Sequence, residues 1–506
     1  MNSDSLLRYW PAVFIVLLGA GLRIYGLGTE SLWLDEALSW NQARLPLSAL
    51  MTSIAADVHP PLYALLLHAF VAALGDSEWV LRLPSVICST VSIGLTWAVC
   101  RHVVGERAAW IAALLCAISV FSIQYAQEAR MYALLCCLAL ASMLCFVRMV
   151  YAAGTGQGSF RHGPSRAAQA AYLLTTALLM YSHVYGLFIV IAQNVVMALR
   201  YLPRWPARPA VSLRHWVLLQ MTLGAIFLPW AWVLVNQVAR VQTAFWIDRP
   251  DAGDLIETFT QYMGVPLALQ IGAVIALTGL VALLRPGADA TEQRPAALAP
   301  LDAATLLTAW LVIPIGLPFV LSLVAQPIFM PRYTIASSPA WFMLMAAGVS
   351  AVPRPWLRNG VLALLVLVMG AVLPVYYSSN VKTNWPAVVA LVENDAQAGD
   401  LVLFHNPDVL VPWQYYHHRS DLLLQTVVAA DTWQAAGVTD TRKPDVRPLA
   451  SVHAQVWLVS GYDRKTAITE LEIVNQLASV HRPLGGREFG AIRVFRFAGR
   501  PGTAKQ

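Results

Sequence analysis

The feature that most constrains this chain is a long series of apolar stretches separated by short polar connections. A helix needs about 20 mostly apolar residues to cross a bilayer, and about eleven stretches of that kind precede residue 377. They lie near Trp10–Tyr25, 79–100, 107–124, 131–151, 168–183, 184–200, 215–236, 265–284, 304–324, 333–352 and 356–376. Only 12% of the 506 residues are charged, against about 25% in soluble domains. We therefore predict a polytopic α-helical membrane protein.

Arginines in the connections predict the orientation, because basic loops remain in the cytoplasm. The stretch 59–75 is short for a span. If it is a re-entrant or juxtamembrane helix, every basic connection falls on the cytoplasmic side, and if it crosses, every one falls outside. The arginines are Arg101 and Arg107; Arg148, Arg161 and Arg166; Arg200, Arg204, Arg208 and Arg214; Arg285 and Arg294; Arg354 and Arg358.

We therefore predict that 59–75 does not cross. The first loop, 28–78, and the C-terminal part are then extracytoplasmic, at the outer face of the inner membrane. The net charge of +6 is explained by cytoplasmic loops, so it gives no indication of a nucleic-acid partner, whereas membrane lipids surround the chain.

Beyond residue 376 polar residues become common and apolar runs shorten. The runs 401–405, 454–460 and 492–497 predict strands. The segments 385–399 and 467–480 have the apolar spacing of helices. Alternating helices and strands predict a small α/β domain outside the membrane. The expected organisation is a transmembrane domain over 1–376 and a soluble extracytoplasmic domain over 377–506.

Ionisable residues near membrane depth are costly and mark candidate sites. On the predicted topology, several such residues from distant segments gather at the outer face. They are Asp35, Glu36, Asp57, His59, Glu128, Arg130, His183 and Arg332. Singly, each has a plainer explanation: the first two acids suit an interfacial helix, Arg130 can extend to head groups, and His183 can bond between spans. Their convergence points to a site.

Short motifs contain most of these residues. They are WLDEA (33–37), HPPLY (59–63), LRLPS (81–85), QEARMYAL (127–134), SHVYGLF (182–188) and PRY (331–333). Together they resemble the GT-C class of membrane glycosyltransferases, most closely the family-39-like branch related to protein O-mannosyltransferases and to the transferases that add aminoarabinose to lipid A. The resemblance covers residues 10–350 and implies a GT-C fold with juxtamembrane helices between the spans.

The resemblance implies transfer of a sugar from a polyprenyl-phosphate donor to a hydroxyl of an envelope lipid, glycan or protein, with inversion. Asp35 matches the catalytic acid of the first-loop motif in relatives. Its neighbour Glu36 is the second catalytic candidate, which either shares the chemistry or positions Asp35. Donor phosphate or substrate would be bound by His59, Arg130, Tyr132 (which precedes Ala133), His183, Arg332 and Tyr333. No cofactor is implied, and we expect metal-independent transfer. A divalent metal site formed by Asp35, Glu36 and His59 stays open as an alternative, although their spacing is not diagnostic.

Other classes of membrane protein remain open. A lipid or polysaccharide transporter or flippase without transferase activity would usually show internal repeats and charges at mid-membrane, and the sequence shows neither. A polysaccharide polymerase or ligase would need a large outer loop between late spans, whereas the large outer part here is the C-terminal tail. A structural or interaction protein would leave the clustered acids and arginines unexplained.

Overall fold

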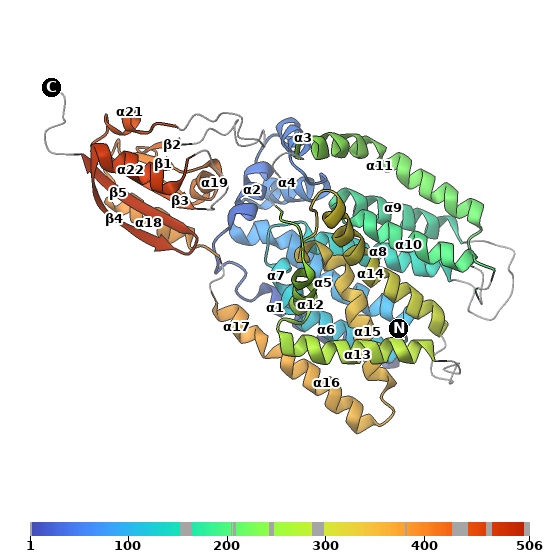
Figure 1. Ribbon diagram of the computed structural model, residues 1–506. Coiled ribbons are helices and arrows are strands. Elements are labelled where there is room, and N and C mark those ends of the chain that lie inside the picture. The colour runs from blue at the N-terminus through green and yellow to red at the C-terminus, as the bar shows by residue number, and fades with distance from the viewer. Residues whose placement is uncertain are drawn as a thin grey trace. The chain divides into compact units, whose positions relative to one another are not determined.

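The computed structural model describes residues 3–151, 164–203, 205, 209–241, 247–285, 298–379, 382–427, 444–461 and 468–499. Their contacts divide the chain into two compact units, whose elements are labelled in Figure 1. The membrane unit holds most residues before 380, and the C-terminal unit holds the described residues after 380. The first-loop segment Gly28–Leu45 belongs to the C-terminal unit, although its neighbours in sequence belong to the membrane unit.

The membrane unit is built from helices, as the apolar stretches predict. They are α1 (Ser3–Ile24), α3 (Leu47–Ala56), α4 (Leu62–Leu74), α5 (Glu78–Val103), α6 (Glu106–Ile118), α7 (Val120–Ala126), α8 (Tyr132–Val150), α9 (Arg166–Ser182), α10 (Gly186–Tyr201), α11 (Leu213–Val241), α12 (Ala252–Met263), α13 (Pro266–Leu284), α14 (Pro300–Val324), the 3₁₀ helix η2 (Pro331–Ser337), α15 (Ser338–Ala351), α16 (Pro355–Gly370) and α17 (Val372–Ser378).

Among the described residues, seven helical segments are long and apolar enough to cross a membrane, or eight if the bent pair α6–α7 is one span. The expected multi-pass α-helical membrane protein is therefore confirmed, while the total of about eleven spans stays a prediction. Helix α4 has 13 residues and is about 20 Å long at 1.5 Å per residue. It is shorter than the ~30 Å hydrocarbon core, and its predicted re-entrant or juxtamembrane role stays a prediction.

The span expected near 107–124 is not one straight helix. Helices α6 and α7 meet at Ser119 with a bend of 56°, and the Ser119 hydroxyl caps α7. The last carbonyls of a helix have no partner within it. Here Arg23 of α1 supplies donors, at 3.0 Å to the carbonyl oxygen of Ala117 and 3.1 Å to that of Cys116. Helix α7 then leads into the QEAR segment.

Helices α13 and α15 pack backbone against backbone. A Cβ added to Gly279 would lie 2.1 Å from the carbonyl oxygen of Leu344, and one added to Gly348 would lie 2.0 Å from that of Ile275. Small residues that permit such approach are how membrane helices associate without a hydrophobic driving force. Because α15 is buried over nearly its whole length, the helix η2 directly before it is attached to a firmly packed element.

The C-terminal unit is the expected α/β domain. Its sheet has the order β2-β1-β3-β5-β4, in which β1 runs parallel to β2 and β3, and β5 runs antiparallel to β3 and β4. The elements are α2 (Leu34–Ala43), α18 (Trp385–Asp395), β1 (Leu401–Phe404), α19 (Pro407–Tyr416), β2 (Leu423–Thr426), α21 (Arg447–Ala450), β3 (Gln455–Gly461), α22 (Glu470–Val480), β4 (His481–Phe489) and β5 (Ile492–Gly499). Alternate residues of β1 and β3 enter two apolar clusters, one with α18 and α19 and one with α21 and α22, so helices cover both faces.

Strands β1, β3 and β5 and helices α18 and α22 occupy the segments where the sequence predicts them. Strands β2 and β4 are not predicted. β4 contains Pro483, Gly485 and Gly486, residues that argue against a central strand. These residues are tolerated because β4 is an exposed edge strand, which pairs with β5 alone in the sheet order. Its register against β5 shifts between Pro483 and Gly485.

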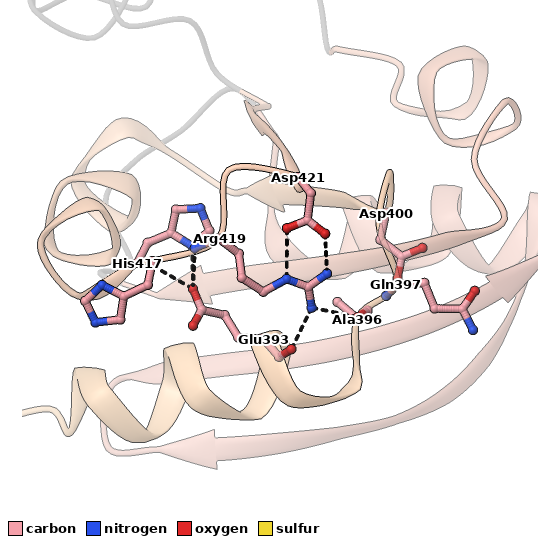
Figure 2. A network of polar contacts seen from close by, with 8 residues as sticks. Glu393, Ala396, Gln397, Asp400, His417, Arg419 and Asp421 are labelled. Atoms are coloured by element: carbon pink, nitrogen blue, oxygen red, sulfur yellow. Dashed lines mark hydrogen bonds and ion pairs between the residues drawn. The ribbon is translucent and has the colours of Figure 1, made fainter.

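A network of charged groups joins the end of α18 to the turn before β2 (Figure 2). Arg419 donates to both carboxylate oxygens of Asp421, at 3.0 and 2.6 Å, and to the carbonyl oxygen of Glu393. The Glu393 carboxylate accepts from the His417 ring and from the backbone N–H groups of His418 and Arg419. Burial by itself would raise the pKa of Glu393, but these hydrogen bonds outweigh it and lower that pKa below its ordinary value.

Candidate functional site

The residues predicted to bind substrate lie together within the membrane unit, and we call them the histidine–arginine cluster. They are His59, Arg130, Tyr132, His183, Arg332 and Tyr333. They come from the turn before α4, the start of α8, the turn between α9 and α10, and η2. At the α9–α10 turn a Cβ on Gly186 would lie 2.6 Å from the carbonyl oxygen of Leu179, so this tight reversal requires glycine.

A hydrogen bond and a series of ring contacts connect the residues of the cluster. Arg130 Nη2 donates to His59 Nε2 at 3.2 Å. The His59 ring centre lies 5.5 Å from that of His183, which lies 5.0 Å from that of Tyr333. Tyr132 stacks on Tyr333 at 6.0 Å. Side chains from four distant segments thus share one small volume.

His183 is fixed in one orientation. Its Nδ1 accepts the backbone N–H of Tyr185 at 3.1 Å, so the proton of the neutral ring is on Nε2. The residue is 2% exposed, and its Nε2 has no hydrogen-bond partner among the described residues. A buried donor without an acceptor costs about 1–3 kcal/mol. An acceptor oxygen of a ligand at this position would therefore be favoured.

Three of the motifs are joined by hydroxyl contacts. The hydroxyl of Tyr63, in HPPLY, lies 3.2 Å from Ser85 Oγ, in LRLPS. Ser85 Oγ in turn donates to the carbonyl oxygen of Arg130 at 3.1 Å. Both Tyr63 and Ser85 are buried. These two motifs therefore hold the backbone from which Arg130 extends, which gives a physical reason for their presence in the same sequence.

The charge of the cluster suits an anion. Arg130 supplies one cation, and Arg332, whose guanidinium carbon lies 5.6 Å from the Tyr333 ring centre, supplies another. Burial first, and then the charges of Arg130 and Arg332, hold the pKa of His59 well below its ordinary range. His59 is therefore neutral near pH 7 and accepts from Arg130. Two guanidinium groups beside polar rings suit a group with several oxygens, above all phosphate.

The two first-loop acids lie on α2, in the C-terminal unit. Asp35 is half-buried and Glu36 is fully buried. The Oε2 of Glu36 accepts from Lys382 Nζ at 2.9 Å and from the backbone N–H of Trp33 at 3.4 Å. Glu36 therefore contributes to the support of α2, and the role of Asp35 as the catalytic base stays a prediction.

The other two acids that the sequence predicts at the outer face are Asp57 and Glu128, and both lie in the membrane unit. Asp57 ends α3, and its carboxylate accepts the backbone N–H of Val58 at 2.7 Å. Glu128 is buried in the QEAR segment. Across the part of the chain that the structure describes, no group of three or more His, Cys, Asp and Glu residues could hold a metal ion.

Sequence reasoning misses two residues. Arg23 is fully buried in α1 and donates to Ser89 Oγ at 2.7 Å as well as to the α6 carbonyls. A single arginine inside the first apolar stretch is the signal that would have found it. Tyr185, within SHVYGLF, packs its ring 5.6 Å from His183 and 5.4 Å from Tyr333. Its place between two cluster residues cannot be read from the motif.

A comparison with known proteins bears on the class that the motifs indicate. The sequence profile of the Dolichyl-phosphate-mannose-protein mannosyltransferase family matches residues 58–160. That segment contains HPPLY, LRLPS and QEARMYAL, and so the residues that hold Arg130. No curated protein sequence matches the chain.

Solved structures resemble the chain over nearly its full length. ArnT from Cupriavidus metallidurans bound to undecaprenyl phosphate has a TM-score of 0.61 at 15% identity, covering 98% of this chain and 99% of that one. Its apo form has a TM-score of 0.63 at 14% identity, covering 96% and 97%. The archaeal oligosaccharyltransferase AglB from Archaeoglobus fulgidus, in complex with an inhibitory peptide and a dolichol-phosphate, has a TM-score of 0.53 at 12% identity, covering 90% and 69%. At these identities the likeness establishes the fold.

Proposed function

We propose that this chain, which has the fold of the GT-C membrane glycosyltransferases, transfers a sugar from a polyprenyl-phosphate donor to a hydroxyl group. The observation that carries the proposal is the histidine–arginine cluster, with two guanidinium groups and the buried Nε2–H of His183. Such donors match phosphate oxygens. The likeness to an ArnT structure bound to undecaprenyl phosphate supports a polyprenyl carrier.

In the proposed reaction, the acceptor hydroxyl attacks C1 of the sugar on the face opposite the phosphate, so the configuration inverts. The bond from C1 to the phosphate oxygen breaks, and the polyprenyl phosphate leaves with the bonding electrons. Arg130 and Arg332 stabilise the negative charge that grows on the phosphate, and His183 donates to one of its oxygens. Asp35 takes the proton of the attacking hydroxyl.

The arginine-rich connections support an active site and C-terminal unit at the outer face of the inner membrane. The acceptor is then an envelope lipid, glycan or protein. Both hexosyl and pentosyl donors fit the proposal, because the phosphate is the part of the donor that the cluster recognises. No step requires a metal ion or another cofactor.

Binding and transfer, measured separately, test this proposal in proteoliposomes. Arg130→Gln and Arg332→Gln each remove a charged donor, worth about 1.5–3 kcal/mol, so each should weaken undecaprenyl phosphate binding roughly 10- to 100-fold. Asp35→Asn should leave that affinity unchanged and abolish transfer from polyprenyl-phosphate sugars to envelope extract, followed by mass spectrometry. Arg354→Gln, at an exposed position before α16, is the control.

Wild-type affinity in both arginine variants would overturn the phosphate site. Wild-type transfer by Asp35→Asn would remove Asp35 from the mechanism. If the wild-type protein moved labelled polyprenyl lipid between leaflets and formed no glycosidic product, the transporter or flippase alternative would replace the enzyme.

A further inference from the structure

We infer that the C-terminal unit holds and positions the first-loop helix α2, and that Glu36 is an anchor of that helix and not a second catalytic acid. The inference rests on the proposed function in one respect, namely that Asp35 of α2 takes part in transfer. It assigns a role to the α/β domain, for which the sequence motifs indicate no activity.

Helix α2 packs on α19 of the α/β domain. The ring of Trp40 meets that of Tyr415 edge to face, with centres 5.1 Å apart. The backbone N–H of Leu32 donates to the hydroxyl of Tyr416 at 2.7 Å. Leu32 and Ala37 are fully buried and Trp40 is 3% exposed. The apolar residues around the two acids are therefore buried, and Trp40 attaches the helix to α19.

Ser31, three residues before the start of α2, is hydrogen-bonded to the segment that leads into α18. Ser31 Oγ donates to the carbonyl oxygen of Thr383 and accepts the backbone N–H of Trp385 at 3.4 Å. Ser31 stands before α2 and Trp40 lies in its last half. Both ends of the helix are thus attached to the same domain, which restricts both its position and its rotation.

Between these attachments lies the ion pair of Glu36 and Lys382. The Glu36 side chain has no exposed surface and that of Lys382 is 12% exposed, with Oε2 and Nζ 2.9 Å apart. The same carboxylate accepts from Trp33 at the start of α2, where negative charge complements the helix dipole. Removing one partner of a buried pair leaves an uncompensated charge, which is far more damaging than removing both. If Glu36 is an anchor, neutralising it should relieve the damage caused by loss of Lys382. If Glu36 is a catalytic acid, neutralising it should abolish activity whether or not Lys382 is present.

The test is a double-mutant cycle on kcat for transfer in proteoliposomes. Lys382→Met should lower kcat about 100-fold, because the buried carboxylate of Glu36 loses the cation that lies 2.9 Å from it, while undecaprenyl phosphate binding stays unchanged. Glu36→Gln keeps an acceptor for both partners, and the charge that it leaves is that of Lys382, whose side chain is the less buried of the two. This variant should therefore retain at least about a third of the activity. Adding Glu36→Gln to Lys382→Met should restore activity at least about tenfold over Lys382→Met alone, because a neutral amide needs no cation.

Arg487→Met removes a cation from an exposed position on β4 of the same domain and should leave kcat unchanged. Thermal unfolding of each variant shows whether it is folded. A catalytic Glu36 predicts the opposite pattern: Glu36→Gln would be inactive and would not rescue Lys382→Met. That outcome would overturn the anchor assignment.

A cross-link separates this inference from the proposed activity. All six cysteines lie between residues 88 and 145, in the membrane unit. Ser31→Cys with Thr383→Cys should form a disulfide in native membranes under mild oxidation, so the denatured chain should take up two fewer maleimide–polyethylene glycol groups than its reduced form. Ser31→Cys with Arg487→Cys is the control pair. If the pair cross-links but the protein shows no transferase activity, the attachment of α2 to the C-terminal unit is supported and the proposed function is wrong. If the pair does not cross-link, the proposed attachment of α2 is wrong.

Discussion

His59 and His183 lie ring to ring in the cluster, yet their nitrogen atoms indicate different roles. His59 Nε2 accepts from Arg130, so this ring orients the guanidinium. His183 Nδ1 is taken by the backbone of Tyr185, which leaves Nε2 as a buried donor. Of the two, only His183 has a donor whose position is fixed and whose acceptor is absent from the described residues. It should therefore contact the phosphate directly.

This assignment predicts different effects for two substitutions of His183. His183→Phe fills the space but removes the donor, and should weaken undecaprenyl phosphate binding roughly 10- to 100-fold. His183→Gln can place an amide N–H near the position of Nε2 and should lose clearly less. Titration of the purified variants with undecaprenyl phosphate measures both affinities. Wild-type affinity in His183→Phe would contradict a direct contact.

At the scale of elements, most of the membrane helices and the three central strands can be predicted from the sequence, because long apolar runs and β-branched runs are typical of buried helices and strands. The break at Ser119 cannot, since neither Pro nor Gly marks it. Strand β4 is hidden by Pro483 and its glycines, which only an edge position tolerates. In the site, the motifs indicate which residues converge. Lys382, which pairs with Glu36, lies 346 residues further along the chain, so this contact depends on the tertiary fold and cannot be read from the motif.

Arg23 should stabilise the break between α6 and α7. Its guanidinium supplies the donors for the carbonyls of Cys116 and Ala117, and each carbonyl left without a donor costs about 1–3 kcal/mol. Arg23→Gln should lower the unfolding temperature in detergent clearly, and Arg23→Lys, with three donors on one nitrogen, should lower it less. Arg354→Gln should leave it unchanged. If Arg23→Gln unfolded at the wild-type temperature, Arg23 would have no part in holding the break.

On the scale of the whole molecule, close backbone packing and ionised side chains respond differently to pH. Close backbone packing such as that of Gly279 and Gly348 holds the membrane unit, and it does not depend on pH. The C-terminal unit relies in part on carboxylates that accept several hydrogen bonds, those of Glu393 and Asp421. The Arg419 guanidinium lowers the pKa of Asp421, in the same direction as the shift at Glu393. Acid should therefore weaken the contacts of these carboxylates in the C-terminal unit.

Glu393→Gln tests this effect of acid. Because the pKa of Glu393 is lower in the folded chain than its ordinary value of 4.5, its stabilisation is fully present above that value and is lost as the pH falls through the folded pKa. At pH 7 the substitution should cost about 1.5–3 kcal/mol and speed hydrogen exchange in peptides covering β1 and β2. As the pH falls below 4.5, the difference from wild type measured at the same pH should shrink, while peptides from α13 and α15 should show no difference at either pH. Glu488→Gln, at an exposed position on β4, is the matched control. A difference that stayed constant from pH 7 to pH 4 would show that the charge of Glu393 contributes nothing, and that its amide replacement acts through shape alone.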